Sequence, residues 1–193
     1  NVGSATTTTA IGIPNFENFE DRFETAFSPY VISQVFGGSN KNLFKFHTLS
    51  DGQIGAGEFK ITIANIKASA KANNKFGTFD VMIRKVTDND LNPMVLESFS
   101  GLSLDPTSDN FIAKRIGDQY TYFDFDAAAG SKKIVVSGDY SNVSNYVRVE
   151  LSSDLKNGRL DQTSLPTGFR GVYHLVTSGT TPVDGASILT GSF

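Results

Sequence analysis

Residues 77–85 read Gly-Thr-Phe-Asp-Val-Met-Ile-Arg-Lys, and residues 95–101 read Val-Leu-Glu-Ser-Phe-Ser-Gly after a polar interval. Apolar Phe79, Val81 and Ile83 alternate with mostly polar neighbours, and this period of two predicts a β-strand with one buried face. Residues 87–93 are dense in Asn, Asp and Pro, which favour chain reversal. We therefore expect an antiparallel hairpin whose second strand begins at residue 95.

A short helix over residues 106–116 is predicted directly after this hairpin. Asp105 is expected to be its N-cap, because a carboxylate can accept hydrogen bonds from the free N–H groups of the first turn. Pro106 suits the first helical position, where no N–H donor is needed. Gly117 is expected to end the helix in a left-handed conformation.

The predicted helix has an apolar face and a basic last turn. Phe111, Ile112 and Ile116 fall on one side at helical spacing, so we expect them in the core. Lys114 and Arg115 lie in the last turn, where the helix dipole favours cations.

Further strands are expected on both sides of the hairpin. They are predicted over 43–49, 58–66, 120–125, 134–137, 146–151 and 172–177, with a turn at Asp51-Gly52 and loops at 67–75 and 138–145. Gly168-Phe-Arg-Gly171 is expected to be a tight turn. This spacing predicts a β-rich α+β fold, a mostly antiparallel β-sandwich-like domain flanked by a few short α-helices.

The ends of the chain differ from its middle. Residues 1–10 are expected to be a flexible N-terminal segment, 11–177 a single β-rich domain and 178–193 a linker-like C-terminal segment. Within 15–27, Phe residues recur at spacings of three and four, which predicts an amphipathic helix. Its Phe ridge packs either on the sheet or, in the alternative, on a partner.

Composition excludes several classes of protein. Hydrophobic residues make up 39% and charged residues 19% of the chain, as in ordinary globular domains, and 16 Phe with no Trp predict a Phe-rich core. A net charge of -3 gives no reason to expect nucleic-acid binding. Cysteine is absent, so no disulfide or thiol chemistry is expected, and no apolar run approaches a membrane span.

Candidate catalytic and metal-binding residues are few. His47 and His174 lie far apart in probable strands, so each is expected to be a packed or solvated histidine rather than a metal ligand. Asp88-Asn89-Asp90 resembles half of a calcium loop but lacks its Gly and final Glu, so a β-turn is expected. We expect no cofactor, and no constellation suggests an enzyme.

Several stretches resemble, in order, the contractile tail sheath proteins of myoviruses, especially giant phiKZ-like bacteriophages. The longest is Leu104-Asp-Pro-Thr-Ser-Asp-Asn-Phe-Ile-Ala-Lys-Arg-Ile-Gly-Asp118. The others are Ser50-Asp-Gly-Gln-Ile54, Gly77-Thr-Phe-Asp-Val-Met-Ile-Arg84, Val95-Leu-Glu-Ser-Phe99, Tyr146-Val-Arg-Val-Glu150 and Leu165-Pro-Thr-Gly-Phe-Arg-Gly171. Together they fall within about residues 43–175.

The resemblance implies a structural subunit that polymerises as stacked rings around a tail tube. Contraction of these rings drives the tube through the host envelope, without catalysis or ATP. Expected partners are other sheath subunits, the tail tube and the baseplate, in a virion assembled in bacterial cytoplasm. Arg84, Lys114 and Arg115 are candidate subunit-interface residues on an exposed surface.

The family's tube-facing domain and strand-exchanging terminal arms find no match in this sequence, and residue 1 is Asn rather than Met. We therefore expect an outer-domain fragment that is monomeric alone and moves as a rigid body during contraction. The alternative is a carbohydrate-binding β-sandwich module of a phage adhesin. Such a module typically carries exposed Trp or clustered Tyr on one face.

Overall fold

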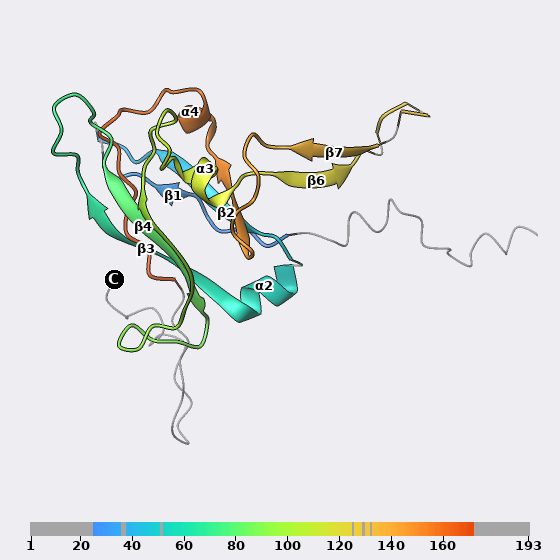
Figure 1. Ribbon diagram of the computed structural model, residues 1–193, viewed down its shortest axis with the longest axis horizontal. Helices are drawn as coiled ribbons and strands as arrows, with labels where there is room; N and C mark the ends of the chain where they lie inside the picture. Colours follow the sequence, from blue (N-terminus) through green and yellow to red (C-terminus); the bar gives the residue numbers. More distant parts are fainter. Residues whose placement is uncertain are drawn as a thin grey trace, which may run out of the picture.

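A computed structural model describes residues 25–35, 38–50, 52–124, 126–128, 130–131 and 133–171. The chain has a β-rich α+β fold in which all paired strands are antiparallel. Two three-stranded sheets, of order β1-β2-β8 and β3-β4-β5, form the body, and the two-stranded β6–β7 ribbon projects from it (Figure 1). The fold class expected from the sequence is confirmed.

The predicted central hairpin is present. Strand β4 (Thr78–Lys85) pairs with β5 (Val95–Leu102) on one side and with β3 (Phe59–Lys67) on the other. The alternation of Phe79, Val81 and Ile83 places all three side chains fully in the core. The strand is therefore the buried centre of its sheet, as its sequence pattern predicts.

The second sheet is built around β2 (Asn42–Thr48), which lies between β1 (Val31–Ile32) and β8 (Val147–Leu151). Its inner face carries Phe44, whose ring stacks on that of Phe79 from β4 with centroids 5.8 Å apart. This pair joins the two sheets into one core. The core contains six Phe residues, Phe44, Phe46, Phe59, Phe79, Phe99 and Phe111, and so confirms the predicted Phe-rich interior.

The helix predicted over 106–116 is wrong in its first half. Only α3 (Ile112–Ile116) is helical, and its N-cap position is Phe111, which forms no side-chain cap. Asp105 instead accepts hydrogen bonds from the N–H (2.9 Å) and the Oγ1 (2.7 Å) of Thr107, so it caps a turn that begins at Pro106. An Asp-Pro pair suits the start of a turn as well as that of a helix.

Long-range pairing explains why the turn is preferred. Ser103 donates its N–H to the carbonyl of Asn110, and Ile112 donates its N–H to the carbonyl of Ser103. The chain must therefore loop back beside its own strand before α3 can begin. The predicted apolar face is nonetheless confirmed, since Phe111, Ile112 and Ile116 are all buried.

Gly117 ends α3, but not in the predicted left-handed conformation. Its φ is 106° and its ψ is 149°, a region that only glycine adopts readily. A Cβ here would also collide with the backbone of Asn142, so the close approach of the 141–144 loop requires glycine.

Two other local predictions need correction. Gly52, expected in a turn with Asp51, instead begins α2 (Gly52–Glu58), which leads directly into β3; Asp51 lies outside the described residues. The helix expected over 15–27 is not helical at 25–27, where Phe27 forms a bridge with His47; its remainder lies outside the described residues. The segments 1–10 and 178–193, and the strand predicted over 172–177, also lie outside them.

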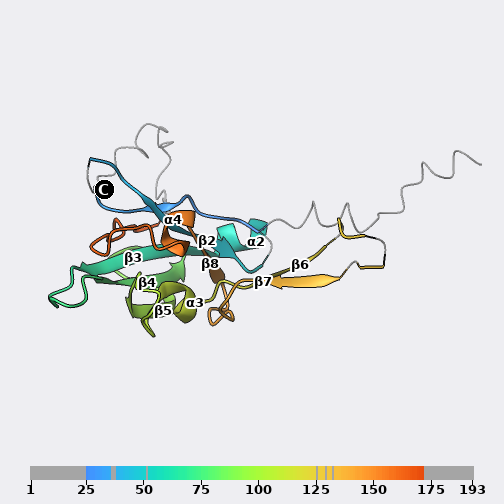
Figure 2. The same cartoon turned by 90° about the horizontal axis from the view of Figure 1, so that it is seen from above.

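The β6–β7 ribbon is set apart from both sheets. Strand β6 (Tyr120–Phe123) pairs with β7 (Ile134–Ser137), and the ribbon extends away from the body in both views (Figures 1 and 2). The last helix, α4 (Ser153–Lys156), follows β8 and is capped by the hydroxyl of Ser152. The strands predicted at 120–125, 134–137 and 146–151 are thus confirmed within two residues.

Candidate functional site

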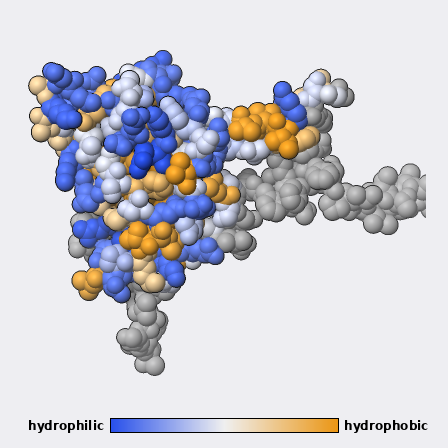
Figure 3. All heavy atoms as spheres, viewed as in Figure 1, coloured by the Kyte–Doolittle hydropathy of each residue, from blue (hydrophilic) through white to orange (hydrophobic). Residues whose placement is uncertain are grey.

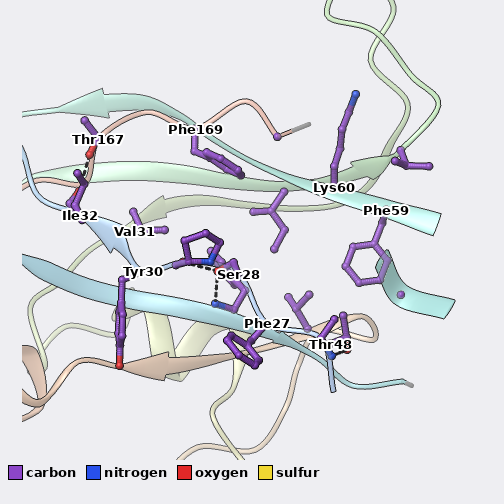
Figure 4. A pocket seen from close by; sticks show the side chains of 18 of the residues that line it. Phe27, Ser28, Tyr30, Val31, Ile32, Thr48, Phe59, Lys60, Thr167 and Phe169 are labelled. Carbon is purple, nitrogen blue, oxygen red and sulfur yellow. Dashed lines mark hydrogen bonds between the residues drawn. The ribbon is translucent and has the colours of Figure 1, made fainter. Parts of the chain in front are cut away.

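An apolar groove of about 560 Å³ lies between the two sheets, on the side of the segments 25–33 and 166–171. Large apolar residues line its walls, among them Phe27, Val31, Phe46, Phe59, Ile61 and Phe169. Figure 4 shows Phe27 and Val31 on one side of this groove and Phe59 and Phe169 on the other. We call it the inter-sheet groove.

One rim of the inter-sheet groove is the segment 25–33, which runs beside β2. Thr48 donates its N–H to the Ala26 carbonyl (2.9 Å) and Ser28 donates its N–H to the Phe46 carbonyl (2.9 Å). Phe27, which lies between these bonds, belongs to a non-hydrogen-bonded pair. Its own N–H and C=O therefore point away from β2, and neither forms a backbone hydrogen bond with any described residue.

The other rim is the segment 166–171, which runs beside β3. Ile63 and Phe169 exchange both backbone hydrogen bonds, and the Arg170 carbonyl accepts a bond from Thr62 Oγ1 (3.0 Å). The tight turn predicted for 168–171 is therefore wrong, because this stretch is extended. The two rims meet where Thr167 donates its N–H to the Ile32 carbonyl (2.9 Å), and the groove opens beyond that point.

The chemistry of the inter-sheet groove is that of a binding surface. Lys60 is the lysine in its wall, but its Nζ is already used by Asp88, at 2.7 Å from Oδ1 and 2.9 Å from the carbonyl. The rest of the groove offers a ligand mainly apolar side chains and the outward-facing backbone N–H and C=O of Phe27. Such a surface suits an extended apolar segment that adds to a sheet edge.

Arg84, a predicted surface contact, is buried in a cluster of charges under the β4–β5 turn. Its Nε and Nη2 donate to the two carboxylate oxygens of Asp88 (2.7 and 2.9 Å), and its Nη1 donates to Asp90 (2.8 Å). Only 3% of Arg84 is exposed, so the prediction that it lies on the surface is wrong. Alternation along β4 correctly put it opposite Phe79, but the turn folds over that face.

Asp88 is the centre of this cluster. Burial by itself raises the pKa of its carboxyl, but hydrogen bonds from Arg84, Lys60 and the backbone of Met94 lower the pKa to about 2. The carboxylate therefore stays charged and fully partnered. This accounts for the Asp88-Asn89-Asp90 stretch without a bound cation, in line with the predicted turn.

Lys114 and Arg115 are exposed on α3, as predicted. Lys114 donates to Asp109 Oδ1 at 2.6 Å, and because both side chains face water this pair contributes little to stability. The role of the two residues in a subunit interface stays a prediction.

A second charged cluster, which the sequence did not indicate, lies on the outer face of β2 and β8. His47 Nε2 is 2.7 Å from Glu150 Oε2, and Lys45 Nζ is 3.1 Å from the other oxygen. His47 Nδ1 is 3.4 Å from Thr25 Oγ1. Burial, together with the nearby charge of Arg148, lowers the pKa of His47, although Glu150 opposes that shift.

This row of hydroxyl, imidazole and carboxylate has the order of a catalytic triad, but its partners favour a structural role. Glu150 is shared with Lys45, and its pKa, although raised by burial, is lowered overall by Lys45 and His47. The cluster also holds the rim segment 25–30 against the sheet, because His47 contacts Thr25 and Glu150 accepts a hydrogen bond from Tyr30. His47 and Glu150 form a diagonal pair across two strands, and because they are 103 residues apart the pair leaves no signal in the local sequence.

The described residues contain no group of three or more His, Asp or Glu side chains placed to hold a metal ion. Within the same ranges, none of the helices combines the length and apolar character that a membrane span requires.

Comparison of the chain with protein-family models, with curated proteins and with solved structures finds no match.

Proposed function

We propose that this chain is the outer part of a contractile tail sheath subunit. The observation that carries the proposal is the resemblance of the long stretch 104–118, accompanied in order by the shorter stretches around it. In the fold, 104–118 forms the turn capped by Asp105 and the helix α3, which packs between β5 and β8. The resemblance therefore falls on the segment that closes one end of the core.

The inter-sheet groove supports an assembly role. A sheath subunit has to hold its neighbours through contacts that are repeated along the polymer, so each contact can be small. The outward-facing backbone groups of Phe27, beside the apolar side chains of the groove, can accept a strand from another subunit by β-augmentation. Neighbouring sheath subunits, the tail tube and the baseplate are the proposed partners, and the proposed location is the phage tail.

The proposed mechanism stores energy in the extended assembly rather than in a bound nucleotide. The Phe44–Phe79 contact joins the two sheets into one close-packed core, and such a core resists continuous deformation. We therefore expect this domain to rotate and translate as one body when the sheath contracts. Fitting it into cryo-EM maps of extended and contracted sheaths tests this, and a need to refold residues 43–171 in the second map would contradict it.

Substitution in the groove tests the assembly role. Phe169→Glu, in the full-length subunit supplied to a phage that lacks its own sheath, is expected to reduce sheath number in electron micrographs at least about tenfold, because one repeated contact is lost at every subunit. Leu91→Glu is the matched control, since Leu91 is an exposed apolar residue that does not line the groove. Normal sheaths with Phe169→Glu would contradict the role of the groove, and a wild-type subunit that never enters a tail would contradict the proposed function.

The 193-residue chain alone is expected to be a soluble monomer, because segments that match the family's terminal arms were not found in it. Analytical ultracentrifugation should give a single species at the mass of one chain. Stable rings or tubes at micromolar concentration would show that the chain polymerises without such arms.

A further inference from the structure

Arg148, on β8, is a buried cation that has no ion-pair or hydrogen-bond partner among the described residues. Only 9% of the residue is exposed, yet its guanidinium forms no ion pair or hydrogen bond with any described residue. The guanidinium does form a cation–π contact with the ring of Tyr120, whose centroid lies 4.5 Å from Cζ. Burial lowers its pKa, and that shift is opposed by Glu150, Tyr120 and Asp118.

The Arg148 donors face an open space. Among the described residues, no fully enclosed side-chain nitrogen or oxygen lacks a hydrogen-bond partner. Since the nitrogens of Arg148 have no such partner, none of them is fully enclosed, and Arg148 lines an adjoining pocket. Guanidinium N–H donors are therefore available to a ligand that enters this pocket.

This pocket, which we call the Arg148 pocket, lies at the base of the β6–β7 ribbon and measures about 440 Å³. That volume is typical of small-molecule sites, which span about 300–1,000 Å³. Its lining includes Tyr120, Ser137, Asp139, Arg148, Glu150 and Lys156. The pocket is on the outer face of β8, because Arg148 points away from the core residues on either side of it in the strand.

The lining offers both donors and acceptors that are not committed elsewhere. Lys156 and Asp139 form no ion pair with any other described residue, and only Oδ1 of Asp118 is used, by the N–H of Tyr140 (2.7 Å). Glu150 is already held by Lys45 and His47. With two cations beside three carboxylates, the pocket has no excess positive charge to attract a strongly anionic ligand.

Aromatic surface adjoins these polar groups. Tyr120 and Tyr122 lie on the same face of β6, with ring centroids 5.6 Å apart and planes inclined by 23°. Both rings remain partly exposed. A sugar presents hydroxyls that donate and accept hydrogen bonds and C–H faces that pack on aromatic rings, so it matches each part of this lining.

We propose that the Arg148 pocket binds a neutral saccharide, with the guanidinium donating to sugar hydroxyl oxygens, Asp139 accepting from sugar hydroxyls, and Tyr120 contacting the ring. The site is separate from the inter-sheet groove and goes beyond the sheath role. A sheath subunit with such a site can hold glycans on the surface of the tail. A carboxylate ligand would use the same guanidinium but would be opposed by Asp118 and Asp139.

The test uses the whole 193-residue chain on an array of immobilised neutral and acidic glycans, followed by titration of any bound glycan in solution. At least one neutral glycan is expected to bind and to shift the guanidinium NMR signals of Arg148. Arg148→Gln is expected to raise the Kd about tenfold or more, because a hydrogen bond from a charged donor is lost. Arg115→Gln, at an exposed arginine on α3, is the matched control and should leave the Kd unchanged.

Asp139→Asn keeps the test decisive if Arg148→Gln does not fold, because Asp139 is exposed and its replacement leaves the core intact. It is expected to raise the same Kd several-fold by removing an acceptor. Three results would overturn the proposal: no neutral glycan binds, binding survives both substitutions, or acidic glycans and acetate bind while neutral glycans do not.

Discussion

The β4–β5 hairpin and the β6–β7 ribbon are both antiparallel strand pairs rich in β-branched and aromatic residues. They differ in burial, because apolar side chains of β4 are enclosed in the core whereas those of β7 face solvent. In the first, β4 lies in the middle of a sheet, and its turn covers the buried cluster of Arg84, Asp88 and Lys60. In the second, Ile134 and Val136 are 67% and 58% exposed. Figure 3 shows an apolar patch on the projecting ribbon.

The difference separates strands that stabilise the domain from strands that are available to other molecules. A two-stranded ribbon alone in water is marginally stable. Its attachment to the body depends on contacts at its base, such as Arg148 over the ring of Tyr120. In the hairpin, by contrast, Phe79, Val81 and Ile83 of β4 are buried in the core, and the turn is fixed to the strand by the buried pair of Asp88 with Arg84. Substitutions should therefore affect stability in the hairpin and binding in the ribbon.

The largest effect is expected from Asp88→Ala in the hairpin. The substitution leaves Arg84 and Lys60 as buried cations without their shared carboxylate, and breaking a buried pair in this way costs about 3–5 kcal/mol. The free energy of unfolding in urea measures it. Asp109→Ala, which breaks the exposed pair with Lys114, is the control and should leave the denaturation midpoint unchanged. Equal effects of the two substitutions would contradict the distinction.

The same carboxylate should make stability depend on pH. The folded-state pKa of Asp88 is about 2, below its ordinary 3.8, so the unfolded chain binds more protons in this interval. The stabilisation is therefore complete above pH 3.8 and lost as pH falls toward 2, a change of about 2 kcal/mol. A carbon-detected NMR titration of Asp88 measures its pKa directly. A midpoint at or above 3.8 would contradict the buried cluster.

Asp105→Ala is expected to cost about 1–2 kcal/mol, through loss of a capped turn rather than of a helix cap. Burial raises the pKa of this carboxyl, but hydrogen bonds from Thr107 and Asn74 lower it overall. Asp161 makes the same two bonds to Thr163 on the surface, so Asp161→Ala is a matched control with a smaller expected effect on thermal unfolding. A larger loss at Asp161 than at Asp105 would contradict the reasoning from burial.

The smallest effect is expected in the ribbon, and it can be measured by making the same Val→Thr substitution once in the ribbon and once in the core. Val136→Thr should change the free energy of unfolding by no more than about 0.5 kcal/mol, because the new hydroxyl meets water. Val81→Thr puts the same hydroxyl into the closed core and should cost about 1–3 kcal/mol. Chemical denaturation of both variants gives the comparison. Similar losses would show that the ribbon is as enclosed as the hairpin.

Local pattern in the sequence was sufficient to predict most strands and the apolar residues that fill the core. An alternation of period two was enough for β4, because successive residues of a strand point to opposite faces of the sheet whatever the rest of the chain does. The apolar face of α3 was predicted for the same reason. The start of that helix was not, because Asp105 and Pro106 suit both a helix and a turn, and pairing of Ser103 with Asn110 selects the turn.

The tertiary structure alone decides which polar residues are buried and which edges stay open. Arg84 looks like a surface residue in its strand, but the 86–94 turn folds over it and supplies two carboxylates. Arg148 looks the same, yet it faces a pocket formed by a ribbon that begins 28 residues earlier. The inter-sheet groove likewise needs segments 25–33 and 166–171 to meet. These contacts join residues that are far apart in the chain. A local periodicity shows which face a residue lies on but not which distant segment will pack against it.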